Sequence, residues 1–210
     1  MGAVEKGWTM TPTHVADSPK PELSEGDRSA LLEIARQSID AAARGQSLKL
    51  PDPERYADPL RRIRACFVTL EQQDELRGCI GTLTARRPLV LEVAHMARAS
   101  AVDDPRFPPV SSDELGHLTV TISVLSEPAP MSFQSEEDLL SQLRRGVDGL
   151  ILRDGMHTGT FLPSVWDKLP SPQEFLQHLK RKAGLGPRHW SSTVRVERYT
   201  TESFSGRWWS

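Results

Sequence analysis

Two kinds of hydrophobic periodicity, helical and strand-like, alternate along this chain, and their order restricts the fold more than any single motif does. Segments with apolar residues at helical spacing begin near Ser24, Pro88, Ser135 and Ser171, and segments with apolar–polar alternation lie between them. The elements follow the order helix, hairpin, helix, strand, twice over, although the residues themselves do not repeat. We therefore predict an α+β fold of mostly antiparallel sheets with flanking helices, arranged as two interlocked subdomains.

The first half of this pattern carries helix and turn signals. Ser24 is a candidate N-cap with an acidic residue three positions later, and Gly45 provides a stop for the helix. Residues 64–70 and 75–82 alternate as two strands, and the polar residues 72–74 between them predict a hairpin turn.

The remaining elements follow from the same two periods. Pro88 opens a second helix, and residues 117–125 alternate as a strand that is covered on one side. A second hairpin is predicted over residues 148–162, where Asp154-Gly155 favours a type I′ turn. A strand over residues 193–201 is expected to close the fold.

The folded part of the chain is expected to span residues 23–205. Residues 1–22 show no hydrophobic periodicity, so we expect a flexible N-terminal tail. Residues 206–210 are expected to form a short C-terminal tail.

The composition is that of a globular protein, with 38% hydrophobic and 26% charged residues. No apolar run approaches the length of a membrane span, and the N-terminus lacks the apolar core of a signal peptide. Two cysteines are too few for a disulfide scaffold, so we expect a reducing, cytoplasmic location. The net charge of -2 gives no electrostatic reason to expect nucleic acid or an anionic membrane as a partner.

The candidate reactive group is Cys79, which stands between Gly78 and Gly81 on a predicted strand. Glycine lets another backbone or a ligand come close, so the two glycines are candidate binding residues. By strand alternation Arg77 shares a face with Cys79, and a nearby cation lowers the pKa of a thiol and favours the thiolate. The alternative is a small buried cysteine whose glycines relieve crowding or form a bulge. The other cysteine, Cys66, alternates with apolar residues and is predicted to pack in the core.

Other candidate site residues come from loops and aromatic positions. His157 is the first candidate for a catalytic base and His189 the second, and the alternative for each, which residue type alone favours, is an ordinary loop or surface histidine. The proline-held loop around Arg106 and Phe107 could present a binding surface, to which Trp166 would add an aromatic ring. The alternative for both aromatic residues is a place in the core.

No motif in the chain predicts a metal ion or a bound cofactor. The six histidines are scattered, without the spacing of a metal site, and no glycine-rich loop opens a helix to hold phosphates. The basic run at residues 180–182 is typical of a solvated helix end, so nucleic-acid binding is not expected.

Four landmarks occur in a fixed order along the chain. They read LRGCIG at 76–81, DPRFPP at 104–109, FLPSVW at 161–166 and KAGL at 182–185. Together they resemble the AMMECR domain family, in particular the bacterial type called AmmeMemoRadiSam system protein A. The resemblance covers roughly residues 24–205, so we interpret residues 23–205 as an AMMECR-type domain.

The resemblance implies a two-part α+β fold and two partners, a Memo-like protein related to extradiol dioxygenases and a radical SAM protein. It implies no agreed reaction. The sequence departs from the family pattern at Ser164, where a glutamine is usual, and in the helix before residue 182, where many members have a second cysteine. A mechanism that needs a cysteine pair is therefore excluded.

Two functional hypotheses follow. In the first, a cleft lined by Arg77, Cys79 and Arg106 binds or acts on a small anionic ligand, with Cys79 as nucleophile. In the second, the chain is a non-catalytic adaptor that docks the two partners.

Overall fold

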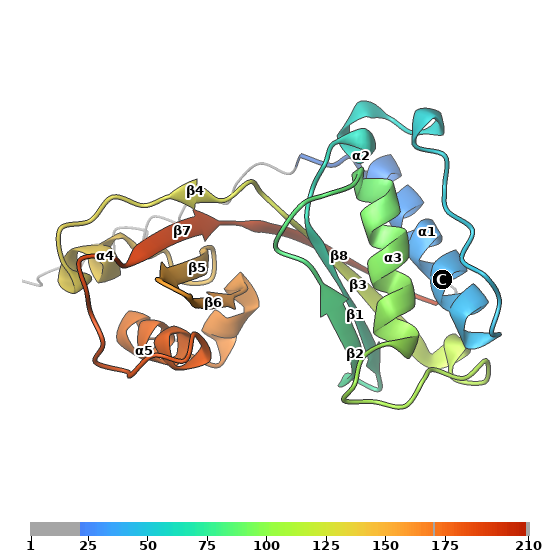
Figure 1. Ribbon diagram of the computed structural model, residues 1–210. Coiled ribbons are helices and arrows are strands. Elements are labelled where there is room, and N and C mark those ends of the chain that lie inside the picture. Colours follow the sequence, from blue (N-terminus) through green and yellow to red (C-terminus); the bar gives the residue numbers. More distant parts are fainter. Residues whose placement is uncertain (1–21, 170, 209–210) are drawn as a thin grey trace, which may run out of the picture.

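The protein has two lobes, each built on a four-stranded antiparallel sheet. The computed structural model describes residues 22–169 and 171–208 (Figure 1). The expected tail at residues 1–22 therefore lies outside the described part of the chain, except for its last residue. Five α-helices and two antiparallel sheets within these ranges confirm the predicted α+β fold with flanking helices.

The first lobe packs two long helices on one face of its sheet, which has the strand order β2-β1-β3-β8. Figure 1 shows both helices on the same side of the sheet, while the opposite side looks towards the second lobe. Its elements are α1 (Glu25–Ala43), α2 (Asp58–Arg61), β1 (Cys66–Gln72), β2 (Glu75–Gly81), α3 (Leu89–Val102), β3 (Leu118–Leu125) and β8 (Thr201–Arg207).

The second lobe has the strand order β4-β7-β5-β6 and two shorter helices. Its elements are β4 (Ala129–Pro130), α4 (Glu136–Gln142), β5 (Gly149–Asp154), β6 (His157–Phe161), α5 (Pro172–Lys182) and β7 (Arg195–Tyr199). The chain passes from the first lobe to the second after β3 and returns between β7 and β8, so the two lobes are interlocked as expected (Figure 1).

The predicted helix signals form as expected. The Ser24 hydroxyl accepts a hydrogen bond from the backbone N–H of Asp27, whose carboxylate in turn accepts from the Ser24 N–H. This reciprocal capping box satisfies two donors at the start of α1. Gly45, just past the end of α1, has a φ of 66°, which glycine adopts without strain.

The two hairpin turns differ from each other. In the first, Gln73 and Asp74 both have positive φ, as a type I′ turn requires. In the second, Asp154 pairs with His157, so the turn residues are Gly155 and Met156, of which only Gly155 has positive φ. This pattern is typical of a type II′ turn, so the type I′ turn predicted at Asp154-Gly155 is wrong by one residue.

The end of the chain is more ordered than the sequence indicates. The strand predicted over residues 193–201 is two strands, β7 in the second sheet and β8 in the first. Strand β8 continues to Arg207, and Trp208 is buried in the core of the first lobe. The expected C-terminal tail is therefore wrong for residues 206–208, because their backbone pairs with β3.

Each lobe has its own apolar core, and a smaller cluster joins them. Ala65 and Leu125 from the first lobe meet Ile151 and Tyr199 from the second sheet, and all four are buried. Burial raises the pKa of the Tyr199 hydroxyl to about 12, and that hydroxyl donates to the Phe161 carbonyl. The junction is therefore packed, with its polar group paired.

None of the described helices combines the length and apolar character that a membrane span requires.

Candidate functional site

Cys79 lies on β2, the outer strand of the first sheet, and its side chain is partly exposed. It is paired with Thr69 of β1, and the Thr69 hydroxyl lies 3.2 Å from the Cys79 Sγ. In contrast, Cys66 on the helix-covered face is fully buried, which raises its thiol pKa and confirms its predicted packing role.

The outer edge of β2 at Cys79 is closed by two side chains of the loop after α3. The Cys79 N–H donates to the Asp104 carboxylate at 2.8 Å, and the Cys79 carbonyl accepts from Arg106 Nη2 at 3.1 Å. Arg106 also donates to Asp104 through its backbone N–H, Nε and Nη2. The pair therefore takes the place of a neighbouring strand and holds the Cys79 peptide in a fixed position.

Charge concentrates at this point. The Arg106 guanidinium holds the pKa of the Asp104 carboxyl well below its usual range, and the hydrogen bond from Cys79 contributes. Asp104 in turn raises the pKa of Arg106, and the neighbouring Cys79 adds to that rise. The Asp104 side chain is 3% exposed and that of Arg106 is 53% exposed. The guanidinium is thus anchored at one end and open to solvent at the other.

Arg77 does not act on Cys79, so the predicted pairing of these two residues is wrong. The register of β1 and β2 shifts between Leu70 and Glu71, and Arg77 has no partner residue in β1. Such a bulge re-aims the side chain that strict alternation would place beside Cys79.

The Arg77 guanidinium is used to hold the next loop. It donates to both carboxylate oxygens of Glu114, at 2.7 and 3.2 Å, and to the carbonyls of Pro108 and Pro109. This pairing lowers the pKa of Glu114 to about 2. The cation that lies beside the thiol is therefore Arg106, and Arg77 supports the loop that presents it.

The two glycines of the motif are explained by packing inside the protein. A Cβ on Gly78 would lie 2.2 Å from the Ser100 carbonyl oxygen of α3, and one on Gly81 would lie 2.3 Å from the Phe67 ring. Their expected role in binding a ligand thus has no support in these contacts, which match the alternative of relieved crowding. The Ser100 hydroxyl lies between the strands, where it accepts from the Ile80 N–H and contacts the Val68 carbonyl.

Hydroxyl groups continue from Cys79 across the face of the sheet that carries no helix. The strand registers place Cys79, Thr69, Thr121 and Ser205 in one row across four strands. The hydroxyls of Thr121 and Ser205 lie 2.8 Å apart, and Ser123 and Ser203 form a second such pair at 2.9 Å. This face can therefore offer hydrogen bonds to a polar ligand beside the thiol.

Neither candidate histidine lies on the sheet that carries Cys79. His157 is on β6 of the second sheet, with its Nδ1 3.0 Å from the Ala183 carbonyl oxygen. His189 contacts the Asp154 carboxylate at 2.6 Å. Side-chain hydrogen bonds lower the pKa of Asp154 to about 2; the largest effect is from Thr193, and those of His189 and Ser191 are smaller. This carboxylate therefore holds together the loop before β7.

The two aromatic candidates have different places. Trp166 is 1% exposed, stacks on Phe175 with ring centroids 3.9 Å apart, and donates its Nε1–H to the Asp148 carbonyl. The expectation that Trp166 lines a binding surface is therefore wrong, because the ring is part of the second lobe's core. Phe107 is half-buried, with the Arg106 guanidinium 5.5 Å from its ring centroid, so it remains at the candidate site.

Three residues that matter here were not singled out from the sequence, namely Asp104, Thr69 and Glu114. Asp104 precedes a proline, which is a turn signal, but nothing local shows that its carboxylate reaches a strand 25 residues away. Among the described residues no cluster of three or more His, Cys, Asp or Glu side chains could hold a metal ion.

These features define a class of α+β proteins with two antiparallel sheets. In this class, one cysteine lies on an edge strand at a helix-free sheet face, and side chains of a neighbouring loop pair with the open edge of that strand. The family model AMMECR1 matches residues 32–204, and the chain belongs to this family.

Relatives of similar length support the assignment. A protein of Methanothermobacter thermautotrophicus is 40% identical over 189 residues, which cover 87% of this chain and 95% of that protein. One from Saccharolobus solfataricus is 37% identical and covers 85% of this chain and 81% of its own length. The crystal structure of an uncharacterized protein from Pyrococcus horikoshii matches with a TM-score of 0.74 and 36% identity, over 83% of this chain and 89% of that one.

Proposed function

We propose that the chain binds or acts on a small anionic ligand at Cys79, as an AmmeMemoRadiSam system protein A that works with a Memo-like protein and a radical SAM protein. The observation that carries the proposal is the position of the Arg106 guanidinium. The guanidinium is held by the Asp104 carboxylate and donates a hydrogen bond to the Cys79 carbonyl. Its other end is open to solvent beside the thiol.

This arrangement suits an anionic ligand for two reasons. A fixed guanidinium attracts an anion and offers directed N–H donors, without first having to be ordered. The same positive charge favours the thiolate form of a neighbouring cysteine, which is its nucleophilic form. The hydroxyl row at Thr69, Thr121 and Ser205 supplies further donors and acceptors on the same face.

Two matched alkylating reagents test the proposal. Iodoacetate and iodoacetamide attack the same thiol, but only iodoacetate carries a negative charge. On a Cys66→Ser background, we expect Arg106→Gln to lower the ratio of the iodoacetate rate to the iodoacetamide rate, because the local positive charge is lost. Arg145→Gln serves as the control, since it removes the same charge from an exposed position in the other lobe. An equal change in both variants, or no change in either, would contradict the proposal.

An adaptor function is the second candidate, and the Arg106–Phe107 stack favours it. This stack stands on a proline-held loop outside the two main cores, and Arg and aromatic residues often dominate protein interfaces. Under this proposal, Phe107→Ala would weaken capture of the Memo-like or radical SAM partner while leaving the two alkylation rates unchanged. Unchanged capture by Phe107→Ala would reject it.

A further inference from the structure

A cavity of about 510 Å³ lies at the junction of the two lobes. It is bounded by the segment just before β1, by the chain that follows β2 and by the chain that leaves β3 for the second lobe. Neither Cys79 nor Arg106 lines it, so it is distinct from the site described above. Its volume is within the range of small-molecule sites.

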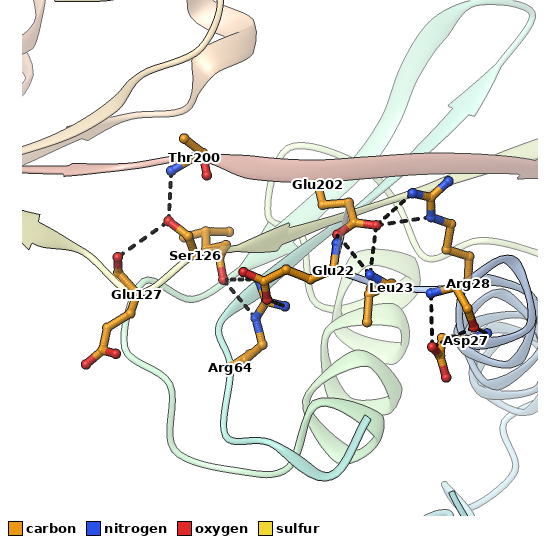
Figure 2. Close-up of polar contacts among 11 residues, drawn as sticks. Glu22, Leu23, Asp27, Arg28, Arg64, Ser126, Glu127, Thr200 and Glu202 are labelled. Atoms are coloured by element: carbon orange, nitrogen blue, oxygen red, sulfur yellow. Dashed lines mark hydrogen bonds and ion pairs between the residues drawn. The ribbon is translucent and has the colours of Figure 1, made fainter. Parts of the chain in front are cut away.

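Arg64 lines one side of the cavity, and hydrogen bonds hold its guanidinium in place. Its Nε and Nη2 donate to the Leu125 carbonyl at 3.1 and 3.0 Å, and its Nη1 donates to the Glu22 carboxylate at 2.9 Å (Figure 2). The Arg64 side chain is 12% exposed and the Glu22 side chain 54% exposed. The guanidinium is therefore rigid and nearly buried, while the carboxylate at its open end is free to exchange with another anion.

A second cation stands at the same cavity. Arg62 lines it and is exposed, and within residues 22–169 and 171–208 its side chain makes no hydrogen bond or ion pair. Glu127 also lines the cavity, but Figure 2 shows its carboxylate directed away from Arg64. The cavity is thus lined by one arginine without a hydrogen-bonded partner among these residues and by one whose anionic partner is exposed.

Apart from Ser126, the rest of the lining is apolar. Ile63 is 61% exposed, which is unusual for a large branched side chain, and it lies between the two arginines in sequence. Leu83 and Leu125 line the same cavity and also belong to the cluster that joins the lobes. A site with arginines beside exposed aliphatic side chains suits a ligand with a charged end and a hydrocarbon body.

We propose that this cavity binds a small aliphatic carboxylic acid. Its carboxylate replaces that of Glu22 at Arg64 and contacts Arg62, while its hydrocarbon part covers Ile63 and Leu83. Glu22 then acts as an internal competitor, and its displacement links ligand binding to the segment that leads into α1, because the Glu22 N–H donates to Glu202 of β8 (Figure 2).

Four probe molecules separate the two halves of the proposal. Hexanoate, hexanol, hexylamine and acetate are titrated into the full chain while the backbone amide NMR signals of Ala65, Leu83 and Ala85 are followed. We expect hexanoate to shift these signals at lower concentration than any other probe. Equal binding of hexanol or hexylamine would overturn the role of the arginines, and equal binding of acetate would overturn the apolar part.

Substitutions at exposed positions test the individual residues without disturbing the core. We expect Arg62→Gln to weaken hexanoate binding at least about threefold, and Glu22→Gln to strengthen it by a similar factor, as surface ion pairs of this kind allow. Arg145→Gln removes the same charge from an exposed position in the other lobe and should have no effect. Cys79→Ser should also bind hexanoate normally, so failure at this cavity and failure at Cys79 are distinguishable. An Arg62→Gln variant no weaker than Arg145→Gln, or no gain in Glu22→Gln, would overturn the proposal.

Discussion

The Asp104 carboxylate accepts the backbone N–H of Cys79 at 2.8 Å, which joins two parts of the chain that lie 25 residues apart. An exposed edge strand normally leaves such donors unpaired and open to other chains. Here the donor is satisfied by a side chain that Arg106 holds in turn. The LRGCIG and DPRFPP segments are therefore one structural unit, in which the second segment locks the edge on which the first presents its thiol.

Removal of the Asp104 carboxylate should destabilise the protein strongly. Asp104→Ala leaves the Cys79 N–H unpaired and Arg106 without its anchor, so we expect a loss of about 2–3 kcal/mol in the free energy of unfolding. The neighbouring Asp103→Ala is the control, since the Asp103 side chain is 52% exposed and pairs with Arg98 at the surface. It should cost no more than about 1 kcal/mol in urea unfolding. Equal losses of unfolding free energy for the two variants would contradict the structural role of Asp104 at the edge of β2.

A methyl group at position 78 should disturb the contact between α3 and β2. The Cβ of Gly78→Ala would meet the Ser100 carbonyl oxygen at 2.2 Å, and backbone atoms cannot move aside as a flexible side chain can. We expect a loss of about 3 kcal/mol. In Gly116→Ala the new Cβ has no atom within 4 Å among the described residues beyond its chain neighbours, so stability should change by less than about 0.5 kcal/mol. Calorimetric melting of both variants checks this, and a mild Gly78→Ala would show that α3 can shift freely.

The Arg77–Glu114 pair should give stability that depends on pH. Its carboxyl pKa is lowered from 4.5 to about 2 in the folded protein. A lowered folded pKa stabilises the fold above the unfolded pKa, and this contribution is lost as pH falls from about 4.5 through about 2. The wild type should therefore be more stable than Glu114→Gln at neutral pH, and the difference should shrink over that window. Urea midpoints at a series of pH values measure it, and a constant difference would refute the pairing.

Much of the fold is predictable because its signals are local. The N-cap at Ser24, the alternation of β1 and the hydrophobic stripe of α3 each depend on residues within a few positions of one another. The continuation of β8 to Arg207 is not local, since it depends on pairing with β3.

The candidate site was harder to predict from the sequence, because its contacts join residues that are far apart in the chain. The importance of Cys79 and Arg106 could be proposed from their motifs, but the role of Arg77 could not, because strand alternation carries no information about a bulge. Trp166 illustrates another gap. A tryptophan suits both a core and a binding surface, and only its stacking on Phe175 decides between them.

The most direct test of the account is the pH dependence of Cys79 alkylation by the neutral reagent iodoacetamide, on a Cys66→Ser background. The rate at about pH 7 is divided by the rate at about pH 10, which corrects for differences in access to the thiol. If Arg106 favours the thiolate, this ratio falls in Arg106→Gln, is largely retained in Arg106→Lys, which keeps the charge, and is unchanged in Arg145→Gln, an exposed arginine of the other lobe. A ratio that does not fall in Arg106→Gln, a ratio that falls equally in Arg145→Gln, or a thiol that does not react in the folded protein would contradict the account.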